Sequence, residues 1–311
     1  MKNQSFFAFV SAFAISVSAC GSDQGRLPSV NSVDKNSFSK VQEDSITTLL
    51  QKYVTEERNI KYKLWLDSAE DLQSLKAILS AMSAQDLTGK SADEIKAFYI
   101  NAYNLMTIDL ILSNYDETLG KTLSRYPNQR SIRNIKNLDG RVWDEFKWVI
   151  AGRRVSLNDV EHKILRPMGD ARIHFAIVCA SIGCPPILNR AFVSDSLNAT
   201  LDALSTEFVN SGRSTTFDVS AKRIKTSKIL DWFKEDFVKS YGSLEEFFVK
   251  YVTVIPADQI SKMKIGFLDY SWILNEDLGD DDGDDDDDDD DDGGSGTEEE
   301  GGSGTEAGGN L

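Results

Sequence analysis

The segment that begins at Ser91 constrains the fold of this chain more than any other. Ser91 and Glu94 have the spacing of a capping box, in which the serine accepts a hydrogen bond from the third helical N–H and the glutamate reaches back. We expect the helix that they open to run from about Ala92 to Ser113. Apolar residues occupy most of its circumference, so it is predicted to be buried on several sides. The other elements must then pack around it.

Two asparagines, Asn101 and Asn104, lie within this apolar helix. A buried polar side chain costs free energy unless it is hydrogen-bonded, so each amide needs a partner. One interpretation is structural, with the two amides tied to the backbone of a loop. The other is functional, with one of them orienting a catalytic histidine or binding a substrate.

The rest of residues 37–275 predicts an α+β fold: a single, mainly helical domain around a small, largely antiparallel sheet. Helical spacing of apolar residues recurs in several segments: 38–53, 72–82, 156–165, 197–208, 229–237 and 244–251. Extended structure is expected at other places: a connection at 59–66, hairpins at 146–155 and 216–226, a central strand at 173–179 and a last strand at 265–270.

The N-terminus has the pattern of an export signal. Residues 1–19 contain an apolar stretch too short to span a membrane as a helix. It ends in Val-Ser-Ala-Cys20, which resembles the bacterial lipoprotein signal. The resemblance implies a lipid-modified Cys20, palmitate-type acyl chains that anchor the protein, and residues 20–36 as a tether. Gly21 after the cysteine favours the outer membrane. The alternative is an ordinary secretory signal with an unmodified Cys20.

Acidity is concentrated at the C-terminus. Residues 276–311 hold 18 of the 50 acidic residues and no lysine or arginine, so the rest of the chain carries 32 acidic against 34 basic residues. Like charges at this density repel, and we expect a disordered, solvated acidic tail. The remainder is nearly neutral and has no basic stripe with interleaved aromatics, so nucleic-acid binding has no support.

The segment 172–188 concentrates the rare reactive residues. It holds His174, Cys179 and Cys184, and the other histidine, His162, lies on the helix predicted just before it. On a regular strand His174 and Cys179 would face opposite sides. A partnership would require a cysteine past the strand end or an approach from His162.

Three interpretations of these residues remain open. In a thiol enzyme, Cys179 or Cys184 would be a nucleophile activated by His174 or His162. In a non-catalytic module, the two cysteines would form a disulfide, which export permits, or two buried thiols. A two-His, two-Cys metal site is the third, but the spacings match no familiar zinc pattern. We predict no metal and no cofactor.

Four motifs resemble the domain of unknown function 547 family over about residues 50–255. They are Phe-Tyr-Ile-Asn-Ala-Tyr-Asn at 98–104, Ser-Leu-Asn-Asp-Val-Glu-His at 156–162, the histidine–cysteine segment 172–185, and Thr-Ser-Lys-Ile-Leu-Asp-Trp-Phe at 226–233. The resemblance carries no activity. By analogy, the mixture of a buried helix, a small sheet and a Cys/His pair suggests a fold akin to papain-like or transglutaminase-like enzymes, and fold does not determine function.

The sequence therefore predicts an exported lipoprotein of the cell envelope that acts as a binding or scaffold module. The lipid anchor would attach the protein to the membrane, and the sequence does not identify a protein or envelope partner. The alternative is a thiol hydrolase or acyltransferase that uses Cys179 or Cys184 with a histidine.

Overall fold

A computed structural model describes residues 40–120 and 129–279 of the chain. The predicted signal, Cys20 with its lipid, the tether at 20–36 and the acidic tail from residue 280 onward lie outside these residues. Within the described part, no helix is both long enough and apolar enough to cross a membrane.

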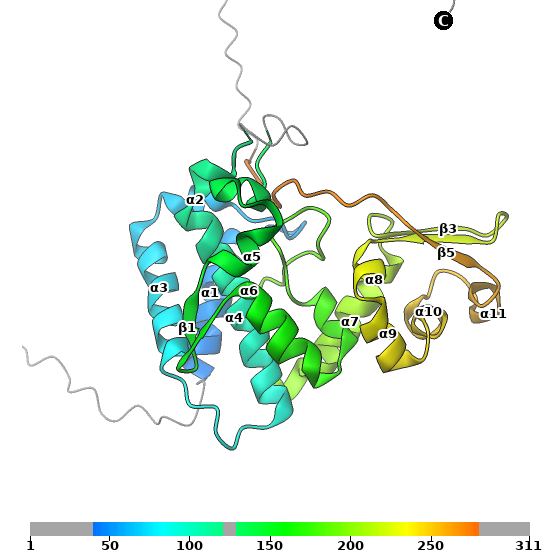
Figure 1. The fold of residues 1–311 in the computed structure, drawn as a ribbon, viewed down its shortest axis with the longest axis horizontal. Helices are drawn as coiled ribbons and strands as arrows, with labels where there is room; N and C mark the ends of the chain where they lie inside the picture. Colours follow the sequence, from blue (N-terminus) through cyan, green and yellow to red (C-terminus); the bar gives the residue numbers. More distant parts are fainter. Residues whose placement is uncertain (1–39, 121–128, 280–311) are drawn as a thin grey trace, which may run out of the picture.

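The fold is the predicted α+β type, mainly helical and with largely antiparallel strand pairing (Figure 1). Its strands form two small sheets, where the prediction had one. The α-helices of four residues or more are α1 (Lys40–Tyr53), α2 (Tyr62–Leu66), α3 (Ala69–Ser83), α4 (Ala92–Ser113), α5 (Val142–Glu145), α7 (Leu197–Asn210), α8 (Ile229–Trp232), α9 (Lys234–Tyr241), α10 (Leu244–Tyr251) and α11 (Ala257–Ile260). A single turn, α6 (Leu157–Asp159), continues into the π-helix η4 (Val160–Leu165). The 3-10 turns are η1 (Tyr115–Thr118), η2 (Ile132–Asn137), η3 (Asp139–Arg141), η5 (Arg166–Met168), η6 (Ala171–Phe175) and η7 (Ser194–Ser196).

Helix α4 is the centre of the domain. The predicted capping box is present, because Ser91 Oγ accepts from the Glu94 N–H and the Glu94 carboxylate accepts from the Ser91 N–H. Every residue from Lys96 to Leu112 is buried. α3 and α2 pack on this helix, and α6 with η4 packs on it as well. The expectation of a helix buried on several sides is confirmed.

The strands form two small sheets, the first of which touches α4 through a hydrogen bond from Trp148 Nε1 to Asp109 Oδ2. β1 (Trp148–Ile150) and β2 (Arg153–Val155) form an antiparallel hairpin, and β3 (Thr215–Asp218) pairs with β4 (Arg223–Thr226) in the same way. Both hairpins were predicted. β5 (Lys264–Phe267) joins β4 in parallel, with Ile224 opposite Ile265. The last strand is thus confirmed, although it ends earlier than the predicted residue 270.

The predicted central strand at 173–179 is wrong. Its first part is the 3-10 turn η6, and after Phe175 the chain passes through a turn at Ala176 and a bend at Ile177 into irregular structure. The apolar run indicates burial, and a buried strand and a buried turn have the same apolar signature. Here a side chain of α4 supplies the backbone hydrogen bonds: Asn104 donates to Ala176 O at 2.9 Å and accepts from the Val178 N–H at 2.9 Å.

The connection at 59–66 also differs from the extended structure predicted. Residues 62–66 form α2, because Tyr62 and Trp65, three residues apart, are both buried on one face. Trp65 stacks on Tyr53 of α1, with ring centroids 4.3 Å apart.

The chain after β5 returns across the domain (the orange segment in Figure 1). Its backbone pairs with three separate regions: Ile273 O accepts from the Ile182 N–H, the Leu274 N–H donates to Arg130 O, and Asn275 O accepts from the Ile60 N–H. Glu276, at the predicted start of the tail, accepts from the Tyr115 hydroxyl and pairs with Arg130. This returning segment, residues 268–276, brings Tyr270 and Trp272 beside residues 178–184, which are called the cysteine loop below.

Gly183 gives a test of this close packing. A Cβ at Gly183 would lie 2.7 Å from Ser271 O and 2.9 Å from the Tyr270 ring. We therefore expect Gly183→Ala to lower the free energy of unfolding by about 1–3 kcal/mol, because backbone or ring must shift. Urea denaturation measures the change. Gly212→Ala is the control, since a Cβ there has no neighbour within 4 Å. Equal stability of the two variants would contradict the packing of the returning segment on this loop.

Candidate functional site

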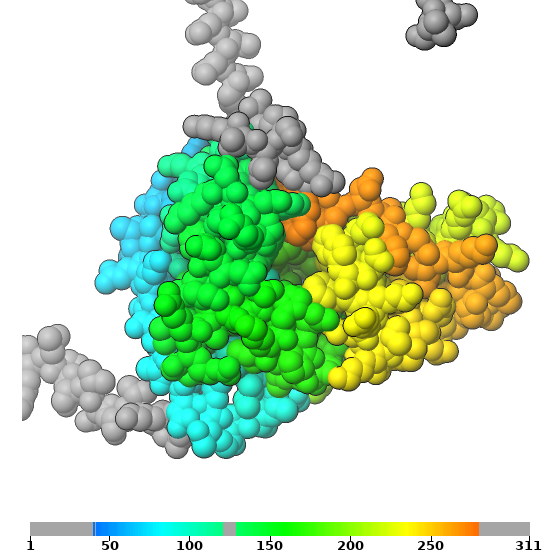
Figure 2. Space-filling model, in the orientation of Figure 1, coloured from blue at the N-terminus to red at the C-terminus, as the bar shows by residue number. Residues whose placement is uncertain are grey.

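A cavity of about 210 Å³ lies where η4, the cysteine loop, α8 and the returning segment meet. In the space-filling view the domain is hollowed between its green, yellow and orange parts (Figure 2). Residues from sequence positions as distant as Tyr103 and Trp272 line it. The cavity is thus assembled by the tertiary fold rather than by one local motif.

Aromatic side chains form one wall of the cavity. Trp143 comes from α5, Trp232 from α8, and Tyr270 and Trp272 from the returning segment. The ring centroids of Trp232 and Tyr270 are 4.8 Å apart, those of Tyr270 and Trp272 4.6 Å, and those of Trp143 and Trp272 5.4 Å. Trp232 is 47% exposed. A row of partly exposed rings offers flat apolar surface to a ligand.

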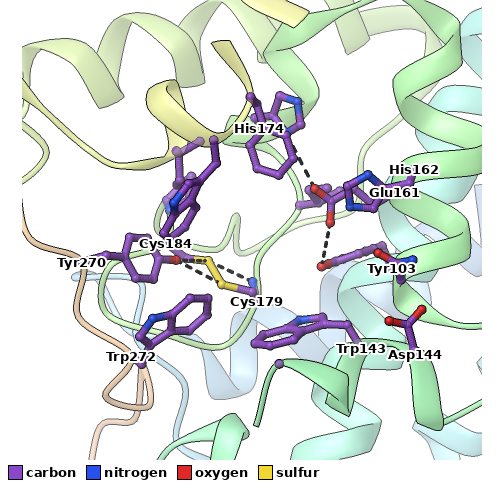
Figure 3. A pocket seen from close by; sticks show the side chains of 17 residues that line it. Tyr103, Trp143, Asp144, Glu161, His162, His174, Cys179, Cys184, Tyr270 and Trp272 are labelled. Carbon is purple, nitrogen blue, oxygen red and sulfur yellow. Dashed lines mark hydrogen bonds and ion pairs between the residues drawn. A yellow bond between two sulfur atoms is a disulfide. The ribbon is translucent and has the colours of Figure 1, made fainter. Parts of the chain in front are cut away.

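The opposite side carries Glu161, whose carboxyl group lies between His174 and Tyr103 (Figure 3). The Tyr103 hydroxyl donates to Glu161 Oε2 at 3.4 Å, and His174 Nδ1 is 3.9 Å from Glu161 Oε1. Both contacts are long for hydrogen bonds to a carboxylate. The Glu161 side chain is 13% exposed. Burial raises the pKa of Glu161 to about 7, although Arg166 and the Tyr103 hydroxyl act in the opposite direction.

His174 is fixed from the other side by Asp236 of α9. His174 Nε2 is 2.8 Å from Asp236 Oδ2, and the imidazole stacks on Phe233 with centroids 3.8 Å apart. Burial lowers the pKa of His174, more than the hydrogen bond from its ring to Asp236 raises it. The neutral ring therefore carries its hydrogen on Nε2 and turns a bare Nδ1 toward Glu161.

Arg166 neutralises Asp236 and holds the second histidine. Its Nε donates to Asp236 Oδ2 at 2.6 Å, and a second nitrogen donates to Oδ1 at 3.1 Å. Arg166 Nη1 lies 2.6 Å from His162 Nδ1, so that nitrogen accepts. Burial, together with the charge of Arg166, lowers the pKa of His162. Burial works to raise the pKa of Asp236, but the hydrogen bonds from His174 and Arg166 bring it below its usual range.

Cys179 and Cys184 form a disulfide in the cavity wall. The sequence left open whether the two cysteines form a disulfide or stay as thiols, and the structure shows the disulfide. The sulfurs are hydrogen-bonded to Tyr270, to Ser181 and to the backbone N–H of Cys179. Among the described residues, no hydrogen bond joins either sulfur to a histidine. With both sulfurs in this bond, there is no thiolate for the hydrolase chemistry considered from the sequence.

The two asparagines of α4 act as structural ties. Asn101 donates to Phe192 O and accepts from the Phe192 N–H, both at 2.8 Å. Asn104 makes the equivalent pair of bonds to Ala176 and Val178. Neither bonds a histidine, and neither lines the cavity. Both residues make the ties to loop backbone that the structural interpretation expects.

Four of the six candidate residues therefore meet at one cavity: Cys179, Cys184, His162 and His174. Strand alternation does not separate His174 from Cys179, because residues 173–179 form no strand. Sequence reasoning missed Glu161, Asp236 and the aromatic wall. The sequence holds one sign that Glu161 belongs to a site, because it directly precedes the candidate His162 on the predicted helix. Its π-helical backbone, a feature frequent at functional sites, cannot be seen in the sequence. In the described residues, no group of three or more His, Cys, Asp or Glu side chains is placed to hold a metal ion.

Residues 87–209 match the family described as "Protein of unknown function, DUF547". The matched range contains α4, the β1–β2 hairpin, η4 and the disulfide loop, and it ends within α7. It does not reach Trp232, Asp236 or Tyr270. Searches of curated proteins and of solved structures found no significant match.

The raised pKa of Glu161 predicts a pH-dependent stability. The folded protein holds a proton on Glu161 at pH values where the unfolded chain, with a pKa of about 4.5, has lost it, so this residue reduces stability as pH rises from about 4.5 to 7. We expect Glu161→Gln to match the wild type near pH 4.5 and to exceed it by about 3 kcal/mol at pH 8. Urea unfolding at several pH values measures the difference. Glu57→Gln, at an exposed glutamate, is the control; a difference between Glu161→Gln and wild type that is constant with pH would contradict the assignment.

Proposed function

We propose a binding function for this chain, whose residues 87–209 match the DUF547 family. The cavity takes up a small ligand, or one end of a larger one, that joins a flat apolar group to a cationic group. The observation that carries the proposal is an aromatic wall facing a poorly hydrogen-bonded carboxyl group in a single cavity. No reaction is assigned to the domain.

The charges around the cavity favour a cation. Asp144 and Glu161 line it, and no lysine or arginine is among its lining residues in the described part of the chain. Asp236 is neutralised by Arg166, and both histidines are held toward their neutral forms by burial and by Arg166. The negative charge that a ligand meets is therefore that of Asp144 and Glu161.

The aromatic wall complements this charge. The face of a tryptophan or tyrosine ring attracts a cation within about 6 Å of its centroid, and several rings together form the kind of cage that binds substituted ammonium groups. A volume of about 210 Å³ is below the range of about 300–1,000 Å³ typical of sites for drug-sized ligands. The proposed ligand group is accordingly no larger than a single amino-acid side chain or a comparable ring.

The thiol hydrolase or acyltransferase predicted as the alternative is less well supported. Its nucleophile would have to come from Cys179 or Cys184, which are bonded to each other. Its orienting amide would come from Asn101 or Asn104, which are already hydrogen-bonded to backbone.

We further propose that this binding domain is exported and anchored in the outer membrane by a lipid on Cys20, facing an envelope partner or ligand. The support is the sequence pattern that ends in Val-Ser-Ala-Cys20 and the intramolecular disulfide, which is typical of oxidising compartments.

Three matched probes test the ligand class: benzylammonium, benzyl alcohol and phenylacetate, which share a ring and differ in charge. We expect benzylammonium to bind on the order of tenfold more tightly than benzyl alcohol, and phenylacetate most weakly. Calorimetric titration measures the affinities. Because Glu161 ionises near pH 7, the affinity for benzylammonium should rise from pH 6 to pH 8, and Glu161→Gln should remove this rise.

The same titration with variants locates the site. Trp232→Ala should weaken binding of all three probes, because it removes an exposed ring of the wall. Leu64→Ala is the control, since Leu64 is 52% exposed on α2 and outside the cavity. Tightest binding by phenylacetate, or affinities that Trp232→Ala leaves unchanged, would contradict the proposal.

The anchor is tested separately. In a diderm bacterial host, the wild-type chain should take up labelled palmitate and fractionate with the outer membrane, whereas Cys20→Ser should lose the label and leave the membrane fraction. Cys179→Ser is the control and should retain both. A wild-type protein that is released unlabelled after export would favour the ordinary secretory signal.

A further inference from the structure

The disulfide is placed where a ligand in the cavity can reach it. Cys179 is partly exposed, whereas Cys184 is only 6% exposed. Both line the cavity, and Figure 3 shows the bond beside Tyr270 and opposite the Glu161 side. Of the two cysteines, Cys179 is therefore the more open to a nucleophile that enters the cavity.

Hydrogen-bond donors converge on the buried sulfur. The backbone N–H of Cys179 donates to Cys184 Sγ at 3.1 Å. The Tyr270 hydroxyl donates to the same atom at 3.1 Å and also lies 3.2 Å from Cys179 Sγ, so the backbone N–H is the contact that only Cys184 Sγ receives. A disulfide sulfur has no hydrogen, so it accepts in both contacts. Ser181 Oγ lies 3.0 Å from Tyr270 Oη and keeps that hydroxyl in place. The same two donors would stabilise a thiolate on Cys184 more strongly, because hydrogen bonds to charged groups exceed those to neutral ones.

The loop that carries the cysteines is held in place by other bonds. Asn104 binds its start at Val178. The returning segment binds the rest, since the Asn275 N–H donates to Ala180 O, the Ile182 N–H to Ile273 O and the Gly183 N–H to Ser271 O. A disulfide that closes so short a loop restricts the unfolded chain little. These hydrogen bonds do not involve the sulfur atoms, so they can hold the loop when the disulfide opens.

We propose that the Cys179–Cys184 disulfide captures thiol ligands covalently and reversibly. A ligand thiolate attacks Cys179 Sγ and forms a new sulfur–sulfur bond there. The electron pair of the original bond passes to Cys184 Sγ, which leaves as a thiolate and accepts from Tyr270 and from the Cys179 N–H. In the reverse step Cys184 attacks Cys179 Sγ, expels the ligand thiolate and restores the disulfide. No other oxidant or reductant takes part.

The class of thiol follows from the cavity, and this step rests on the proposed function. The same carboxyl groups and rings that favour a cation would surround a thiol ligand bound at Cys179. A thiol attached to an ammonium group, as in an aminothiol, is therefore preferred over a neutral or an acidic thiol of the same length.

The site of attack tests the exchange itself. The purified, detergent-solubilised full chain is mixed with 2-mercaptoethanol, quenched with acid, and alkylated. Fragmentation of the tryptic peptide of residues 173–190 then locates the added groups. We expect mercaptoethanol on Cys179 and the alkyl group on Cys184. The opposite arrangement, or a bond that resists excess thiol until denaturant is added, would overturn the proposal.

The role of Tyr270 is tested by the rate. Tyr270→Phe keeps the ring and removes the donor to Cys184, so mixed-disulfide formation should slow on the order of tenfold. Tyr241→Phe is the control, because it loses a hydroxyl that bonds Tyr251 and is outside the cavity. An unchanged rate in Tyr270→Phe would overturn the assigned donor. The attack on Cys179 in the wild type tests the exchange even if Tyr270→Phe does not fold.

Ligand selectivity is tested with cysteamine, 2-mercaptoethanol and 3-mercaptopropionate. Each rate is divided by the rate of the same thiol with a small-molecule disulfide, which removes differences in intrinsic reactivity. Cysteamine should then be fastest, and Glu161→Gln should reduce its advantage. Regioselective attack with equal normalised rates would retain the exchange and refute the cation-binding cavity. Failure of exchange with intact binding of benzylammonium would refute only the exchange.

Discussion

Two hydrogen bonds from the Asn104 amide determine where the candidate site can form. Asn104 lies on α4, the most buried helix, and its amide accepts from the Val178 N–H and donates to Ala176 O. These bonds replace the ladder that a neighbouring strand would have supplied, so the chain turns after Phe175 instead of extending. Because buried backbone groups must be paired, this turn is fixed relative to α4. The disulfide loop that follows is thereby directed toward the cavity.

The second half of the site comes from far along the chain and depends on that turn. The returning segment pairs its backbone with the loop at Ile182 and Gly183, and it places Tyr270 against the two sulfurs. Only glycine at 183 leaves room for this approach. Tight packing therefore brings residues from α4, the cysteine loop and the last forty residues of the described chain together around one cavity.

Local chemistry was predicted from the sequence much better than the arrangement in space. The capping box, both hairpins and the buried helix α4 follow from residue spacing, because each is stabilised by neighbours in sequence. The apolar run 173–179 predicts a strand, but burial produces the same apolar pattern in a turn. Here the backbone of the turn is hydrogen-bonded to the Asn104 side chain on α4. Cys179, Cys184, His162 and His174 were found as candidates by their rarity. Tyr270 gave no signal, and Trp232 appeared only within the family motif at 226–233, since an aromatic residue that lines a cavity and one that fills a core look alike in one sequence.

The polar residues in the cavity wall and directly behind it form two groups, one whose charges are neutralised and one whose charge can change. Asp236, Arg166 and the two histidines satisfy one another, with a carboxylate matched by a guanidinium and each ring fixed in one tautomer by the hydrogen bond that it makes. Glu161 is left with two long contacts and a pKa of about 7. A proton on Glu161 offers a donor toward His174 Nδ1, whereas its loss leaves a negative charge facing the aromatic wall. The arrangement thus fixes the framework of the cavity and leaves one carboxyl group whose charge a bound cation, or the pH, can change.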